Sequence, residues 1–156
     1  MKRRTFLQGT LAGSALAVAA GAGLLTPTAV LAADWPKNAF DAKSEADAVS
    51  ALFGSSSAAE NSAIKVTAPI QAENGSVVPV KVDAPLDGVE GIAVMVEKNP
   101  SPLATNIDMS GGGASGYYST RIKMGSTSKV TAYVKAGGKL HTASQTVKVT
   151  IGGCGG

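Results

Sequence analysis

The chain has 156 residues, which suits one compact domain, and a formal net charge of +3. Three of its 14 basic residues, Lys2, Arg3 and Arg4, belong to a predicted export signal; the remaining 11 balance the 11 acidic residues, so the charge indicates neither a nucleic-acid nor a membrane partner. A single cysteine and a single histidine exclude a four-ligand structural zinc site and an intramolecular disulfide, and no cofactor-binding motif is present.

Residues 1–32 are typical of a twin-arginine signal peptide. Paired arginines at positions 3 and 4 precede Thr-Phe-Leu, and a weakly apolar stretch rich in alanine and glycine follows. Val30 and Ala32 are small enough for signal peptidase, so we expect cleavage after Ala32 and a periplasmic protein. The alternative is a membrane anchor, which the glycine and alanine content argues against. Because this pathway exports folded cargo, we expect a partner subunit to be loaded first.

Residues 33–57 are predicted to form an N-terminal helix over 33–54, followed by a serine linker. Asp41 is the expected N-cap, and Gly54 is the expected stop. The apolar residues that can share one helix face are Phe40, Ala48, Val49, Leu52 and Phe53.

Residues 58–151 change to a β pattern. About seven strands are expected, at 64–67, 76–82, 91–97, 103–109, 117–124, 129–135 and 140–151. Short strands at regular spacing without intervening helices favour an immunoglobulin-like antiparallel β-sandwich. Pro79 removes a hydrogen-bond donor from its strand, so we expect it at a sheet edge or a bulge.

The last predicted strand is followed by Gly152, Gly153, Cys154, Gly155 and Gly156, which we call the arm. Glycine has no Cβ, so we expect the arm to be thin and flexible, and five extended residues reach about 16 Å. Such an arm can carry the Cys154 thiol into a narrow channel. A thiolate can hold further sulfur atoms covalently. No neighbouring base is visible, which favours a carrier over an enzyme; a frayed terminus with an incidental cysteine is the alternative.

The other singled-out residues are expected to have structural roles. His141 lies on a predicted strand with no carboxylate near it in sequence, which favours an ordinary surface or half-buried histidine. Arg121 is either a solvated strand residue or a partner for an acidic group. Trp35 and Phe40 are expected to anchor the N-terminal segment on the body or on a partner. Packing in the sandwich is expected for Tyr117, Tyr118 and Tyr133, whereas Met109 and Met124 are expected to be core or interface residues and not metal ligands.

Several segments resemble the SoxY family, the sulfur-carrying subunit of the SoxYZ complex of bacterial thiosulfate oxidation. The arm at the end of a strand is the most specific of them, and the twin-arginine signal also fits. The inner segments that are similar are 70–75 with Val78-Pro79-Val80, 97–100, and 119–124. We expect these inner segments to serve the fold or a partner interface rather than chemistry.

The resemblance implies a sulfur-compound carrier with thiosulfate-derived intermediates held on Cys154. A c-type cytochrome would attach thiosulfate, a hydrolase would release sulfate, and in some organisms a molybdenum-containing dehydrogenase would oxidise the remaining sulfane sulfur. The partner subunit would be a SoxZ-like β-sandwich that is exported together with this chain.

Three other functions remain open from the residues alone. The first is a structural sandwich domain dimerised by a disulfide through Cys154. The second is a small-molecule binding module, for which no polar pocket is indicated. The third is an enzyme with Cys154 as nucleophile, but a glycine arm is a poor place to organise a base and an oxyanion site.

Overall fold

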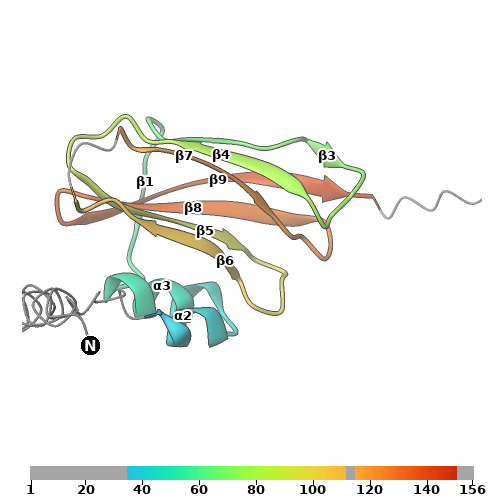
Figure 1. Ribbon diagram of the computed structural model, residues 1–156, viewed down its shortest axis with the longest axis horizontal. Helices are drawn as coiled ribbons and strands as arrows, with labels where there is room; N and C mark the ends of the chain where they lie inside the picture. Colours follow the sequence, from blue (N-terminus) through green and yellow to red (C-terminus); the bar gives the residue numbers. More distant parts are fainter. Residues whose placement is uncertain (1–34, 112–114, 151–156) are drawn as a thin grey trace, which may run out of the picture. The chain divides into compact units, whose positions relative to one another are not determined.

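The computed structural model describes residues 35–111 and 115–150 of the chain. The predicted signal peptide 1–32 and the arm 152–156 therefore lie outside the described residues. Two β-sheets pack face to face, and two short helices cover the outer side of the larger sheet (Figure 1). The predicted immunoglobulin-like β-sandwich is thus confirmed. No helix within the described ranges is long and apolar enough to cross a membrane.

The strands form a larger and a smaller sheet. The larger one has the order β1 (Ala59–Glu60), β9 (Lys139–Val149), β8 (Ser128–Ala136), β5 (Val89–Val96) and β6 (Leu103–Asp108), with β3 (Gln71–Ala72) also paired to β9. The smaller one has the order β2 (Lys65–Thr67), β4 (Val78–Asp83) and β7 (Tyr117–Ile122). All seven predicted strands are present, with their ends shifted by a few residues.

Strands β1 and β3 were missed by the sequence patterns, and they break the antiparallel arrangement. Each has two residues and pairs with β9 in parallel, β1 at 141–142 and β3 at 148–149. On its other side, β9 pairs antiparallel with β8 along nearly its whole length. Strand β9 therefore has neighbours on both sides.

The N-terminal segment forms two helices, α2 (Lys37–Asp41) and α3 (Glu45–Phe53), so the single helix over 33–54 was wrong. Asp41 ends α2 instead of capping a helix. The cap of α3 is Ser44, whose Oγ accepts a hydrogen bond from the Asp47 N–H at 3.1 Å. The stop at Gly54 is confirmed, because this glycine adopts a left-handed φ of 77° and its N–H donates to the Ser50 carbonyl.

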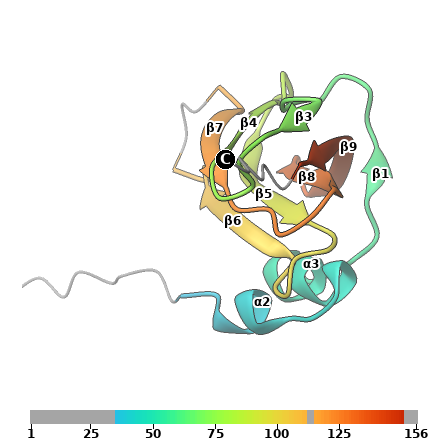
Figure 2. The same cartoon turned by 90° about the vertical axis from the view of Figure 1, so that its right-hand side faces the viewer.

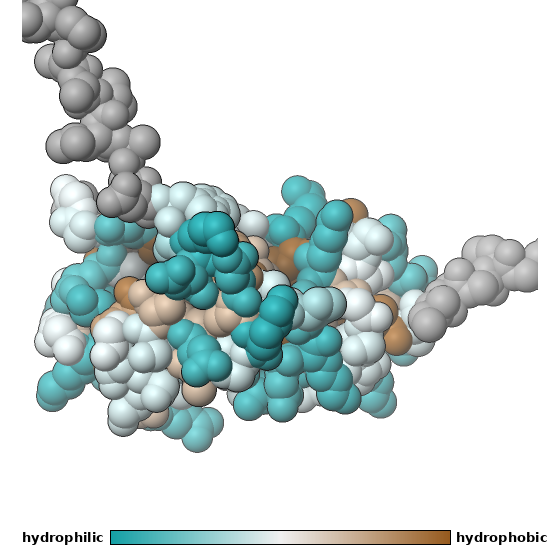
Figure 3. All heavy atoms as spheres, turned by 90° about the horizontal axis from the view of Figure 1, so that it is seen from below, coloured by the Kyte–Doolittle hydropathy of each residue, from teal (hydrophilic) through white to brown (hydrophobic). Residues whose placement is uncertain are grey.

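Residues 91–96 of β5 are buried on both faces of the sheet. Ile92 and Val94 lie in the core between the two sheets, whereas Ala93 and Met95 pack against the helices. Every second side chain of β4 and β8 also points into the core between the sheets; these are Val78, Val80, Val82, Val130, Ala132 and Val134. Hydrophilic side chains and side chains of intermediate hydropathy dominate the surface seen from the helix side (Figure 3), as expected for amphipathic helices.

Aromatic residues attach the helices to the sheet. Phe40 packs in the helix-facing cluster, as predicted, and Tyr133 packs there too while its hydroxyl donates to Glu45 Oε1 at 3.0 Å. Tyr118 packs against the inter-sheet core and hydrogen-bonds to Thr105 Oγ1 at 2.8 Å. Tyr117 was wrongly expected to be packed, since half of its surface is exposed at the start of β7. Trp35 is 69% exposed.

Pro79 lies in the part of β4 that has one neighbour. Strand β2 pairs only with residues 81–83 of β4, so Pro79 faces β7 alone, where it is opposite Arg121. The pairing of β4 with β7 is continuous, so the bulge interpretation is wrong and the edge interpretation applies locally. Arg121 is exposed and makes no salt bridge with the described part of the chain.

Candidate functional site

The predicted attachment residue, Cys154, and its neighbours Gly152, Gly153, Gly155 and Gly156 lie outside the described residues. The last residue that the structure describes is Thr150, four residues before Cys154. The candidate site that can be built is therefore the end of the sandwich where β9 stops, which Figure 2 views end-on. We call this end the arm root.

The end of β9 is fixed by hydrogen bonds from both sides. Thr127 Oγ1 accepts from the Val149 N–H at 3.0 Å, on the side of β8. The Thr150 N–H donates to the Ala72 carbonyl at 3.0 Å, on the side of β3. The last described residue is thus still tied to the sandwich, and any segment beyond it starts from a fixed point.

A tight turn between β3 and β4 packs against this end. The Met124 N–H donates to the Gly75 carbonyl at 2.7 Å. A Cβ on Gly75 would lie 2.3 Å from the Met124 carbonyl oxygen and 3.0 Å from Val149 Cγ1. The glycine is therefore required by close approach, since neither Asn74 nor Gly75 has a positive φ. Asn74 Oδ1 instead accepts from the Ser76 N–H at 2.9 Å.

The loop after β5 joins the same cluster through Asn99. Its Nδ2 donates to the Lys123 carbonyl at 2.8 Å, and its Oδ1 accepts from the Gly125 N–H at 3.1 Å. The three inner segments singled out in the sequence, 70–75, 97–100 and 119–124, therefore meet around the arm root. Their hydrogen bonds are those of interlocking loops, which agrees with the expected structural role. Met124 is buried in the core between the sheets, and Met109 packs against that core, as predicted.

A hollow of about 560 Å³ lies beside the arm root. Among its described lining residues, Glu73 is the only titratable side chain, so no acid–base pair is assembled there. The lining consists of Glu73, Asn74, Gly75, Ser76, Met124, Gly125, Val149 and Thr150.

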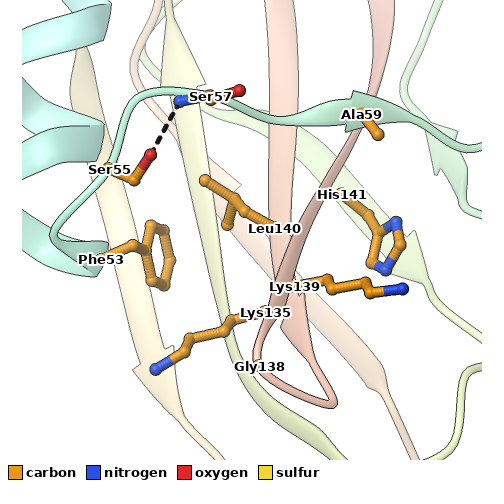
Figure 4. A pocket seen from close by; sticks show the side chains of 9 residues that line it. All are labelled: Phe53, Ser55, Ser57, Ala59, Lys135, Gly138, Lys139, Leu140 and His141. Carbon is orange, nitrogen blue, oxygen red and sulfur yellow. Dashed lines mark hydrogen bonds between the residues drawn. The ribbon is translucent and has the colours of Figure 1, made fainter.

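His141 lies at the far end of β9. It is half-buried, as expected, and its Nδ1 is 3.5 Å from Asn61 Nδ2. Together with Lys139 it lines one side of a pocket of about 360 Å³, with Phe53 on the other side (Figure 4). Thr150 is nine positions after His141, a distance of about 30 Å along an extended strand. The structure therefore does not bring the histidine to the arm root.

Near this far end, Glu90 is paired with Lys135 and with a backbone N–H. Glu90 Oε1 accepts from the Gly138 N–H at 2.9 Å, and Glu90 Oε2 lies 3.1 Å from Lys135 Nζ. These two contacts, the backbone N–H first, hold the pKa of Glu90 below its usual range. The Ser110 hydroxyl and N–H do the same for the pKa of Asp108. Residues 35–111 and 115–150 contain no group of three His, Cys, Asp or Glu side chains placed to hold a metal ion.

Comparison with known proteins assigns the chain to a family. Residues 49–154 match the family described as "Sulfur oxidation protein SoxY". The structure is similar to that of the sulfur carrier protein SoxY from Chlorobium limicola f thiosulfatophilum, with 38% sequence identity and a TM-score of 0.57, over 67% of this chain and 94% of that one. No curated protein sequence matches the chain.

The fold itself is shared more widely. A variant of the superoxide reductase (neelaredoxin) from Ignicoccus hospitalis is 17% identical, with a TM-score of 0.50 over 59% of this chain and 83% of that one. At this identity the likeness concerns the sandwich alone. The family match and the 38% identical structure together place the chain among sulfur oxidation proteins built on a two-sheet β-sandwich. The chain belongs to the SoxY family.

Proposed function

We propose that this protein is a periplasmic carrier that holds sulfur-oxidation intermediates covalently on Cys154 and presents them to partner enzymes. The observation that carries the proposal is the family match, which extends over residues 49–154 and so includes Cys154. The 38% identical relative is itself named a sulfur carrier protein. The fixed end of β9 supports the proposal, because a carrier needs a firm base from which four further residues lead to the thiol.

The proposed chemistry takes place on the arm while the sandwich stays outside the enzymes. Cys154 gives up its thiol proton, and thiol and thiosulfate together give two electrons to a c-type cytochrome, so that an S–S bond joins them. A hydrolase then cleaves the bond to the terminal sulfone with water and releases sulfate, which leaves a persulfide on Cys154. In some organisms a sulfur dehydrogenase would then oxidise the outer sulfur of this persulfide to a sulfonate, with three water molecules as the oxygen source and six electrons passed to an electron-accepting protein. We assign catalysis to the partners, in keeping with the 38% identical relative, which is named a carrier.

The proposed permanent partner is a SoxZ-like β-sandwich subunit. Loading such a subunit before export would give a reason for the twin-arginine signal at residues 1–32. The main competing function is a structural domain dimerised through a Cys154 disulfide. It makes the opposite prediction about small adducts.

The test is the intact mass of the mature protein, purified from its own cells without reductant and measured again after reduction. Because the chain has one cysteine, every reducible adduct must be on Cys154. We expect added masses of one or more sulfur atoms, or of a thiosulfate-derived group, that disappear on reduction and are absent from Cys154→Ser. A thiol that takes up nothing when thiosulfate and the oxidising partners are supplied would contradict the carrier, and a dimer mass lost on reduction would favour the structural domain.

A further inference from the structure

We propose that Ile70 and Val77, together with the hollow beside the arm root, form a docking surface for the channel mouth of each enzyme that Cys154 visits. We call these residues and the hollow the rim. This inference rests on the proposed function and adds to it the surface that the enzymes contact and the chemistry of that contact.

The length of the arm requires contact at the arm root. Cys154 is four residues beyond Thr150, and an extended chain of that length spans at most about 13 Å. An enzyme that takes the thiol into a channel must therefore bring its surface within that distance of Thr150. The arm could reach further only if the end of β9 detached from the sandwich. The hydrogen bonds of Thr150 to Ala72 and of Val149 to Thr127 oppose this detachment.

Two side chains of the rim, Ile70 and Val77, are apolar and exposed. Ile70 is 77% exposed and Val77 is 51% exposed, and they are two of the four large apolar side chains that are exposed in the described part of the chain. Both are held by backbone hydrogen bonds: the Ile70 carbonyl accepts from the Lys148 N–H at 2.9 Å, and the Val77 N–H donates to Asn74. Side chains that are presented in place lose little entropy on binding.

The hollow defines the kind of surface that fits the rim. The four residues Glu73–Ser76, which lie between Ile70 and Val77 in sequence, line it with one carboxylate and otherwise neutral groups. Because Ile70 and Val77 are apolar and exposed, we assign to the enzyme a channel mouth with apolar side chains that cover them. Since the carrier must leave after each step, the contact should be small, on the order of 1,000 Å² or less of total buried surface.

A permanent subunit is a less suitable occupant of the rim. Seated on Ile70 and Val77, it would stand within the reach of the arm and separate Cys154 from every channel. The rim therefore suits partners that come and go, and the permanent subunit is expected to bind another face.

The experiment uses the mature protein with its partner subunit, loaded with thiosulfate on Cys154, and the sulfate-releasing hydrolase as probe. The variants are Ile70→Ser and Val77→Ser. Tyr117→Ser is the matched control, because Tyr117 is 50% exposed but lies opposite Asp83, at the far end of β4 and β7. We expect KM for the loaded carrier to rise about fivefold or more in each rim variant, with kcat within twofold of wild type and the control unchanged.

Each result has a distinct meaning. Unchanged KM in both rim variants, with wild type turning over, would overturn the docking surface and leave the carrier function intact. Loss of the partner subunit from purified Ile70→Ser would also overturn it, because the rim would then belong to the permanent interface. Failure of wild type to load on Cys154, seen by intact mass before any kinetics, would instead contradict the proposed function. Circular dichroism and thermal unfolding verify that the variants are folded.

Discussion

The side-chain amide of Gln145 hydrogen-bonds to both backbone groups of Ala68. The Ala68 N–H donates to Gln145 Oε1 at 3.1 Å, and Gln145 Nε2 donates to the Ala68 carbonyl at 2.7 Å. This pair lies between the places where β1 and β3 join β9. The Gln145 side chain therefore replaces the backbone hydrogen bonds that β1 and β3 make with β9 on either side of this position. It provides partners for both the N–H and the carbonyl of Ala68.

Gln145→Glu tests this role by removing the donor while keeping the size. At pH 7 the carboxylate faces the Ala68 carbonyl, so we expect the free energy of unfolding to fall by about 1–3 kcal/mol. As pH falls through the pKa of the new carboxyl group, its protonated form can donate again, so part of the loss should be recovered. Urea unfolding of variant and wild type at pH 7 and pH 4 measures this. An equal loss at both pH values would show that the donor is unimportant.

Gly75→Ala tests the close packing at the arm root. The new Cβ would lie 2.3 Å from the Met124 carbonyl oxygen, which is backbone and cannot move aside cheaply. We expect a loss of about 1–3 kcal/mol in the free energy of unfolding. The matched control is Gly125→Ala, where the nearest atom, Asn99 Oδ1, is at 3.9 Å. Similar stabilities of the two variants would contradict the explanation given for Gly75.

Thr127→Val tests the clasp on the end of β9. The variant keeps the shape of the side chain but leaves the Val149 N–H without its acceptor. A typical hydrogen bond contributes about 0.5–1.5 kcal/mol, so amide hydrogen exchange at Val149 should become several-fold faster while the amides of β8 stay protected. Thr146→Val, at an exposed position of β9, serves as the control. Unchanged exchange at Val149 would mean that Thr127 does not hold the strand end.

Tyr133 gives the protein a predictable alkaline limit. Burial first, and the Glu45 carboxylate second, raise the pKa of Tyr133 above its ordinary value of 10.0. Above pH 10 the unfolded chain loses this proton before the folded chain does, so this contribution to stability is complete below pH 10 and declines as pH rises further. Tyr133→Phe lacks the titrating group. The stability advantage of wild type over Tyr133→Phe should therefore shrink between pH 9 and pH 11 in chemical denaturation, whereas a constant difference would contradict the assigned cause.

The sandwich could be predicted because its strands carry their own pattern. Strand β4 has valines at every second position, and β5 is apolar on both faces. Such patterns predict burial whatever element packs against the strand. Strands β1 and β3 could not be predicted, because two residues carry no period and both strands exist only through distant pairing with β9. The helix break was missed because Asp41 and Ser44 are both good caps, and tertiary packing decides between them.

The candidate site divides in the same way. Cys154 could be singled out from the sequence, since a lone thiol among glycines has few structural uses, and it stays a prediction. The roles of Gly75 and Gln145 could not be singled out, because each depends on an atom far away in the chain, at Met124 or Ala68.

The pairing of β9 on both sides has a mechanical consequence. A pull on Thr150 along the axis of β9 would shear the hydrogen bonds to β8, β3 and β1 together instead of opening them one after another. Bonds that share a load in this way resist far more force than bonds that unzip in turn. Strand β9 should therefore bear a pulling force without the sandwich unfolding.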